Sequence, residues 1–174
     1  MTDTGSPGIE AAVWPDGTLT WAGRIMRVAL GEAGVVLHKE EGDHGTPSGL
    51  LPLRRVLYRA DRLRTPPHAA VPRELLAPED GWCDDPSSRD YNRMIRLPHS
   101  ARHERLWRDD PLYDVIGVLG WNDAPPERHR GSAIFLHVAT PDLAPTAGCV
   151  ALRLPDLLEL LAGGVTRLRV HPGG

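Results

Sequence analysis

Short apolar runs separated by glycine, proline and acidic residues make up the hydrophobic pattern of this chain. The two most apolar runs, Asp114–Trp121 and Ser132–Ala139, are too short for buried helices and are typical of central β-strands. Other strands are predicted where a short apolar or β-branched run lies between turn residues. These runs are Ala11–Val13, Thr18–Trp21, Arg24–Leu30, Val35–His38, Leu51–Arg59 and Thr166–His171. The pattern therefore predicts about eight strands.

Turn sequences between neighbouring runs predict two β-hairpins. Pro-Asp-Gly at residues 15–17 separates the first two runs, and Gly-Glu-Ala-Gly at residues 31–34 separates the next two. Both turns contain the residue types that tight turns favour. Residues 1–10 are expected to form a frayed polar start.

Helical periodicity is clearest over Leu154–Leu161. Pro155 suits a first helical turn, three leucines fall on one face, and Gly163 is the expected C′ residue. Residues 60–90 predict long loops, with a short helix at Arg73–Leu76, and a further short helix is predicted at His99–Trp107. The chain thus predicts one mainly β domain with one to three short helices.

Composition and charge narrow the possible functions. The net charge of −3 and the pI of about 6.2 argue against a nucleic-acid partner, because such domains are usually basic. The longest apolar stretch, Val115–Trp121, is too short to span a membrane. Residues 1–23 contain no Lys or Arg and no apolar core of a signal peptide. We therefore expect a cytoplasmic protein, or a periplasmic one if the true start lies upstream.

Cys149 and His137 are the candidate catalytic residues. Cysteine catalysis needs a thiol, a base and hydrogen-bond donors for the oxyanion. Cys149 follows Gly148, which permits a tight turn, and His137 ends an apolar run twelve residues earlier. A strand, a loop and a turn can bring the two side chains together over that distance. The alternative interpretation is a buried small thiol and a structural core histidine.

Two sequence blocks resemble one known family. SAIFLHVATPDLAPTAGCVA (132–151) resembles the active-site block of the L,D-transpeptidase catalytic (YkuD) family, in which His and a spacer precede Ser/Thr-x-Gly-Cys. EGDHGTPSGLLPL (41–53) is similar to the family segment Gly-Asp-x-x-Thr-Pro-x-Gly. Trp82–Pro86 and Trp121–Asp123 resemble loops of one branch of this family. Two blocks in the family order, about 90 residues apart, are more specific than either alone.

The resemblance implies a fold and a reaction. The fold would be a YkuD-like β-sandwich, with residues 24–174 as the catalytic domain after a polar segment and possible hairpin at 1–23. The enzyme would be a cysteine acyltransferase that attacks the diaminopimelate–D-Ala bond of peptidoglycan tetrapeptide stems, without a cofactor. Its partners would be stem peptides or muropeptides.

The same resemblance assigns roles to the residues of the motif. Cys149 would be the nucleophile and His137 the general base, and Thr146 would orient the histidine through its side chain or carbonyl. Gly148 and Cys149 would supply the backbone oxyanion donors. Ala147 and Ala151 depart from the family, since many members have His and Arg or Asn there.

Further residues are candidates for shaping the substrate cleft, each with a plain structural alternative such as a solvated turn or a surface arginine. They are Trp82, Asp84, Asp85, Tyr91, Asn92, Asn122 and Arg130. Cys83 lies among carboxylates, which disfavour a thiolate, so we expect a loop thiol there. The histidines are scattered without metal-ligand spacing, so no metal site is predicted.

Two alternatives to a wall-crosslinking transpeptidase remain open. One is a cytosolic L,D-carboxypeptidase that trims recycled muropeptides through the same acyl-enzyme. The other is a non-catalytic protein that binds wall peptides.

Overall fold

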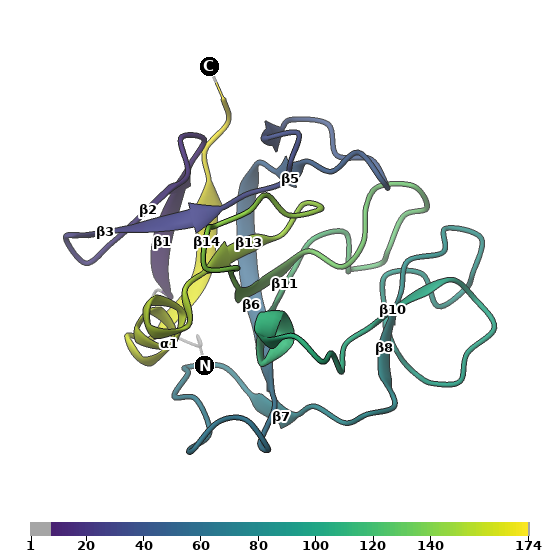
Figure 1. Cartoon of the computed structure of the whole chain (residues 1–174). Coiled ribbons are helices and arrows are strands. Elements are labelled where there is room, and N and C mark those ends of the chain that lie inside the picture. Colours follow the sequence, from purple (N-terminus) through teal and green to yellow (C-terminus); the bar gives the residue numbers. More distant parts are fainter. Residues whose placement is uncertain (1–7, 174) are drawn as a thin grey trace, which may run out of the picture.

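The computed structural model describes residues 8–173 and is built mainly from β-strands (Figure 1). The described part of the chain contains fourteen strands, one α-helix and one 3-10 helix. In chain order they are β1 (Ile9–Trp14), β2 (Thr18–Trp21), β3 (Arg24–Ala29), β4 (Val35–Val36), β5 (Thr46–Pro47), β6 (Gly49–Tyr58), β7 (Arg73–Leu75), β8 (Asp80–Cys83), β9 (Met94–Arg96), β10 (His103–Arg105), η1 (Pro111–Tyr113), β11 (Val115–Leu119), β12 (Phe135–Val138), β13 (Val150–Leu152), α1 (Leu154–Ala162) and β14 (Val165–Val170).

Strands β3 and β6 belong to both layers of a β-sandwich. One layer has the order β3-β2-β1-β14-β6. The other has the order β3-β13-β12-β11-β6, with β7 continuing beyond β6. The pairing of β11 with β6 links the two layers at that side. The predicted mainly β, single-domain fold is confirmed.

Strands β11 and β12 are buried on both faces. Leu136 and Val138 point into the main core between the layers. Phe135 points to the other face, into a second apolar cluster with Trp82 and Tyr113. Burial on both faces explains why these two strands read as continuous apolar runs rather than as alternating patterns.

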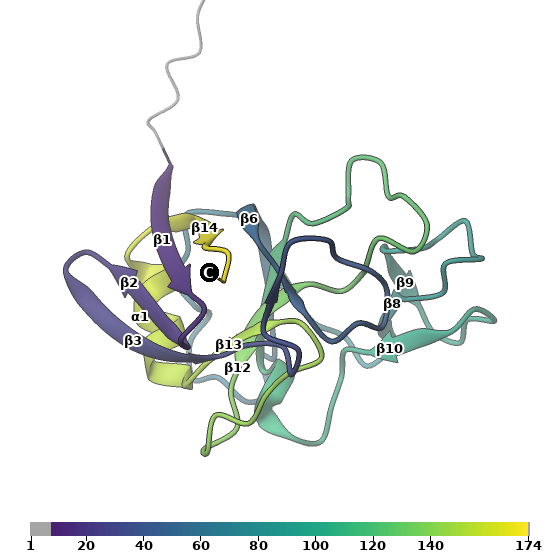
Figure 2. The same ribbon diagram turned by 90° about the horizontal axis from the view of Figure 1, so that it is seen from above.

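A small three-stranded sheet, in the order β10-β8-β9, covers that second cluster. It lies to one side of the sandwich, opposite β1, β2 and β3 (Figures 1 and 2). The short helices predicted at Arg73–Leu76 and His99–Trp107 are wrong. The first segment pairs with β6 as β7, and the second contains β10, which pairs with β8. Both segments have only a weak helical propensity. Pairing with strands from distant parts of the chain therefore decides their conformation.

One predicted hairpin is confirmed and the other is wrong. Strands β1 and β2 pair antiparallel around residues 15–17. Strand β3 pairs with β2 and β13, whereas Val35 and Val36 pair in parallel with Thr46 and Pro47. Ile9 and Glu10, expected in the frayed start, belong to β1, and residues 1–7 of that start lie outside the described residues.

Helix α1 inserts Leu157, Leu160 and Leu161 into the main core, where they are fully buried. The helix starts with Pro155 in its first turn, as predicted. Gly163 is its C-cap in a right-handed conformation, and the positive φ of +84° belongs to Gly164 instead. Within residues 8–173, no helix has the length and apolar character needed to cross a lipid bilayer.

Truncating the buried face of α1 should destabilise the whole sandwich. Leu160→Ala should lower the free energy of unfolding by about 2–5 kcal/mol, because it leaves a cavity in the core. Leu158→Ala, on the half-buried side of the same helix, should cost about 1 kcal/mol. Urea denaturation followed by circular dichroism measures both. Equal losses for the two variants would contradict the packing described here.

Candidate active site

The parallel pairing of β12 with β13 brings Cys149 and His137 to the same face of the sheet. His137 is in register with Ala151, and Cys149 lies two positions before Ala151, so its side chain points to the same side. Both side chains line one cavity of about 530 Å³. Its other walls come from β10, η1 and the loops at residues 39–44 and 140–147. The predicted pair is therefore brought together in a single cavity.

His137 is buried and held as a neutral imidazole. Only 6% of its surface is exposed, and Nδ1 lies 2.9 Å from the Val138 carbonyl oxygen. Because a carbonyl only accepts, Nδ1 carries the proton and Nε2 is left with a lone pair. Burial lowers the pKa of His137, against the opposing effect of the Val138 and Leu112 carbonyls. The tautomer suits a general base that accepts a proton at Nε2.

Cys149 is held as a neutral thiol. Its Sγ donates to the Ala133 carbonyl at 3.2 Å and accepts from the Phe135 N–H at 3.4 Å. Burial raises the pKa of Cys149 to about 12, and the negative charge of Glu104 adds to this. Among residues 8–173, no hydrogen bond joins the thiol to His137. The resting site is thus a neutral thiol beside a neutral imidazole.

Thr146 makes hydrogen bonds within the loop that precedes Cys149. It does not hydrogen-bond His137. Its hydroxyl donates to the Cys149 carbonyl at 2.7 Å and accepts from the Gly148 N–H at 3.1 Å. Its carbonyl accepts from the Glu32 N–H. The orienting contact on His137 that was assigned to Thr146 is made by the Val138 carbonyl instead. Because the Gly148 N–H already donates to Thr146, its role as an oxyanion donor stays a prediction.

The two family-like sequence blocks meet at Gly148. This residue has φ of +135°, and a Cβ placed on it would lie 2.8 Å from the Gly45 carbonyl oxygen. Gly45 belongs to the first block, in the loop that ends at β5. Next to this contact, the Thr46 hydroxyl accepts from the Gly31 N–H at 2.8 Å, and Gly31 forms a bridge with Thr146. Only glycine allows the backbones to approach this closely.

In the part of the chain that the structure describes, the lysine and arginines of the cavity wall are all in ion pairs, whereas two of its three carboxylates, Glu41 and Glu104, are not. Each cation has an acidic partner, in the pairs Lys39–Asp43, Arg102–Asp84 and Arg108–Asp110. Glu41 accepts instead from two hydroxyls, those of Tyr91 and Ser132. Glu104 accepts from the Tyr113 hydroxyl. Neither glutamate has an ion-pair partner within the described residues.

Asn92 clamps the segment that precedes β12. Its Oδ1 accepts from the Trp82 indole at 3.0 Å and from the Ala133 N–H at 3.1 Å. Its Nδ2 donates to the carbonyls of Trp121 and Asn122, at 2.9 and 2.7 Å. All four hydrogen-bonding positions of the amide are occupied. Asn92 therefore positions Ala133, which is left-handed at φ of +53° and accepts from the Cys149 thiol.

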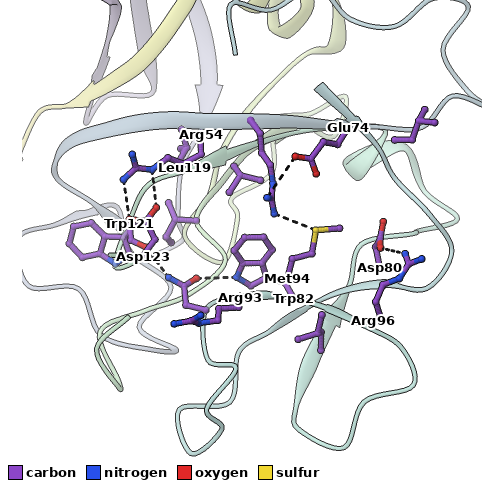
Figure 3. Close-up of a pocket in the computed structure, with 16 residues that line it drawn as sticks. Arg54, Glu74, Asp80, Trp82, Arg93, Met94, Arg96, Leu119, Trp121 and Asp123 are labelled. Atoms are coloured by element: carbon purple, nitrogen blue, oxygen red, sulfur yellow. Dashed lines mark hydrogen bonds and ion pairs between the residues drawn. The ribbon is translucent and has the colours of Figure 1, made fainter. Parts of the chain in front are cut away.

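A second cavity, of about 680 Å³, has Trp82 and Asn92 among its lining residues (Figure 3). Three of its arginines are paired, Arg54 with Asp123, Arg55 with Glu74 and Arg96 with Asp80. Cys149 and His137 are not among its lining residues. The predicted substrate-binding residues Trp82 and Asn92 thus line this cavity and not the catalytic one.

The remaining predicted substrate-binding residues are dispersed. Asp84 lines the catalytic cavity, in its ion pair with Arg102. Asp85 caps a turn by accepting from Ser87 and does not line the cavity. Asn122 and Arg130 line a third cavity. Tyr91 is buried and bonds Glu41, so it supports the catalytic wall from behind.

Glu104, Tyr113 and Arg108 belong to the catalytic cavity but were missed from the sequence. Glu104 and its neighbours were expected in a helix, whereas in β10 alternate side chains face opposite sides. Tyr113 lies edge-on to the His137 ring, with 5.2 Å between centroids. No local sequence signal marks these residues, because distant segments bring them together.

Comparison with known proteins gives one match. A family model for the L,D-transpeptidase catalytic domain (YkuD) matches residues 10–163 of the 174-residue chain. No curated protein and no solved structure matches. In the described part of the chain, no group of three or more His, Cys, Asp or Glu side chains could hold a metal ion.

The close approach at Gly148 can be tested by adding a methyl group. Gly148→Ala should cost about 1–3 kcal/mol more unfolding free energy than Gly49→Ala. Both glycines have a large positive φ, +135° for Gly148 and +119° for Gly49, but a Cβ on Gly49 would meet nothing within 4 Å. The control therefore carries the backbone strain alone, of about 1–3 kcal/mol. Thermal denaturation compares the two, and equal costs would contradict the steric contact with Gly45.

Proposed function

Because the chain belongs to the L,D-transpeptidase catalytic-domain family, we propose that it cleaves peptidoglycan stem peptides through an acyl-enzyme on Cys149. The observation that carries this proposal is the placement of Cys149 and a neutral His137 in one cavity, with His137 in β12 and Cys149 directly before the parallel strand β13. The bond attacked is the one between the L-centre of diaminopimelate and the terminal D-Ala of a tetrapeptide stem.

The proposed first half-reaction forms a thioester. The Cys149 thiol turns from the Ala133 carbonyl toward His137, and Nε2 takes its proton as Sγ attacks the diaminopimelate carbonyl carbon. The tetrahedral intermediate collapses when the imidazolium gives that proton to the departing D-Ala amine. The carbon–nitrogen bond breaks, D-Ala leaves, and the diaminopimelate acyl group remains on Sγ.

The second half-reaction restores the thiol. His137 removes a proton from water or from an amine as that nucleophile attacks the thioester carbonyl. Collapse of this second intermediate breaks the carbon–sulfur bond, and the imidazolium returns the proton to Sγ. Attack by water gives a tripeptide, and attack by the amine of another stem gives a crosslink.

Two features support proton transfer during attack rather than a preformed ion pair. Burial raises the pKa of the thiol to about 12 and lowers that of the imidazole. A thiolate–imidazolium pair is therefore a minor species of the free enzyme at neutral pH. The base must act in the same step in which the carbon–sulfur bond forms.

Hydrolysis is the second candidate outcome of the same acyl-enzyme. Crosslinking requires a second stem to be positioned beside the thioester. Neither the cavity of Figure 3 nor the one lined by Asn122 and Arg130 includes Cys149. This arrangement favours water as the acceptor and an L,D-carboxypeptidase acting on free muropeptides.

Cys149→Ala should reduce D-Ala release from a purified disaccharide-tetrapeptide by several orders of magnitude, since it removes the nucleophile. Cys83→Ala should retain most of the activity, because Cys83 is fully buried in β8 and lies outside the catalytic cavity. Liquid chromatography with mass detection measures the products. Comparable activity of Cys149→Ala and wild type would refute the mechanism.

The same chromatogram distinguishes the two acceptors. Tripeptide and free D-Ala as the main products would identify hydrolysis. A crosslinked dimer as the main product, with little tripeptide, would identify transpeptidation and exclude the carboxypeptidase.

The pH profile should reflect the lowered pKa of His137. The base is active when neutral, so kcat/KM should rise with pH through a midpoint below 6.5, the ordinary histidine value. Because the thiol pKa is far higher, no further rise is expected between about pH 7 and 9. Steady-state D-Ala release from pH 4 to 9 tests this. A midpoint above 7 would contradict a neutral buried base.

A further inference from the structure

Glu104 is a charged group of the catalytic cavity to which the proposed mechanism assigns no role. It lies in the middle of β10 and lines the cavity together with Cys149 and His137. Its carboxylate accepts from the Tyr113 hydroxyl, and the Tyr113 ring lies edge-on to His137. Within residues 8–173, no cation forms an ion pair with Glu104.

Arg108, the cation whose charge acts on Glu104, forms no ion pair with this carboxylate. Arg108 lies over the Tyr113 ring, 5.3 Å from its centroid, but its guanidinium binds Asp110 through two nitrogens. Burial raises the pKa of Glu104, against the opposing effects of Tyr113 and Arg108. A buried carboxylate without a cationic partner is costly, and a cation supplied by a ligand would offset that cost.

Glu41, the other unpaired carboxylate in the cavity, already has a structural task. One of its oxygens accepts from both the Tyr91 and Ser132 hydroxyls, which joins three loops behind the cavity. Glu104 has one hydroxyl donor and keeps further acceptor positions. Glu104 is therefore the better site for a ligand cation.

We propose that Glu104 binds the distal ammonium group of the diamino acid in the donor stem, and that this contact makes the Cys149 thiol more reactive. The inference rests on the proposed function for the identity of the donor. It adds that Glu104 determines which donor is accepted. It also adds that binding of the donor ammonium to Glu104 speeds the attack by Cys149.

The coupling follows from the sign of the charges. A carboxylate near the thiol disfavours the negative charge that develops on Sγ during attack, and Glu104 contributes to the high pKa of Cys149. An ammonium bound to Glu104 cancels that charge. A donor whose side chain lacks the ammonium leaves the charge of Glu104 in place. We expect Cys149 to attack such a donor about tenfold more slowly.

Other groups in the cavity act on the same thiol and must stay constant during the test. The titratable and charged residues of the wall, besides Glu104, are Lys39, Glu41, His44, Asp84, Arg102, Arg108, Tyr113 and His137. Measurements at one pH and one ionic strength keep their contributions equal between variants that differ only at position 104.

The first experiment compares two donors. One is a disaccharide-tetrapeptide with free diaminopimelate, and the other has the distal amine acetylated. Wild type should prefer the free amine by about tenfold in kcat/KM. Glu104→Gln, which keeps an acceptor for Tyr113, should lose most of this preference. Glu127→Gln, which removes an exposed carboxylate outside the cavity, should keep it.

The second experiment needs no substrate. The full-length protein is treated with iodoacetamide at pH 8, and peptide mapping follows Cys149 separately from the fully buried Cys83. Glu104→Gln should be alkylated at Cys149 about tenfold faster than wild type, because a negative charge near the thiol is gone. Glu127→Gln should react at the wild-type rate.

The outcomes separate this inference from the proposed function. Turnover of both donors by wild type at equal rates would overturn the inference and leave the proposed function intact. Turnover of neither donor would overturn the proposed function and the donor assignment together. Unchanged alkylation of Glu104→Gln would overturn the coupling. If Glu104→Gln does not fold, the comparison of the two donors with wild type decides whether the inference holds. Glu104→Asp, which keeps the carboxylate, should then keep the preference for the free amine.

Discussion

The parallel register of β12 with β13 is the constraint on which the site depends. It aligns His137 with Ala151 and so sets Cys149 on the same face, two positions away. Side chains alternate along strands, so a shift of one residue would turn the cysteine into the opposite core. The sandwich secures this register on both sides, because β11 pairs with β12 and β3 pairs with β13.

Burial on that face sets the chemistry. The face is covered by the small β10-β8-β9 sheet and by loops. The resulting burial raises the pKa of Cys149 and lowers that of His137, so both groups are neutral. A neutral pair suppresses unwanted reactions of the thiol in the free enzyme. It also makes the rate sensitive to any charge that a substrate brings into the cavity, which gives Glu104 its proposed importance.

Several residues near the site act on backbone position rather than on substrate. Asn92 accepts from the N–H of the left-handed Ala133 through its Oδ1, and Thr146 uses its hydroxyl to close the turn before Cys149. Gly148 admits the Gly45 carbonyl where a side chain would clash. The contacts of Asn92, Thr146 and Gly148 thus hold the backbone around Cys149 in place.

The sequence by itself determined the mainly β class, the α1 helix, the first hairpin and the candidate pair Cys149 and His137. These follow from local periodicity, turn residues and a motif contained in one short segment. The tertiary structure alone decided that β10 is a strand, that Val138 rather than Thr146 holds the imidazole, and that Glu104 enters the cavity. Such features depend on backbone pairing and burial between distant segments, and no local pattern of residues encodes them.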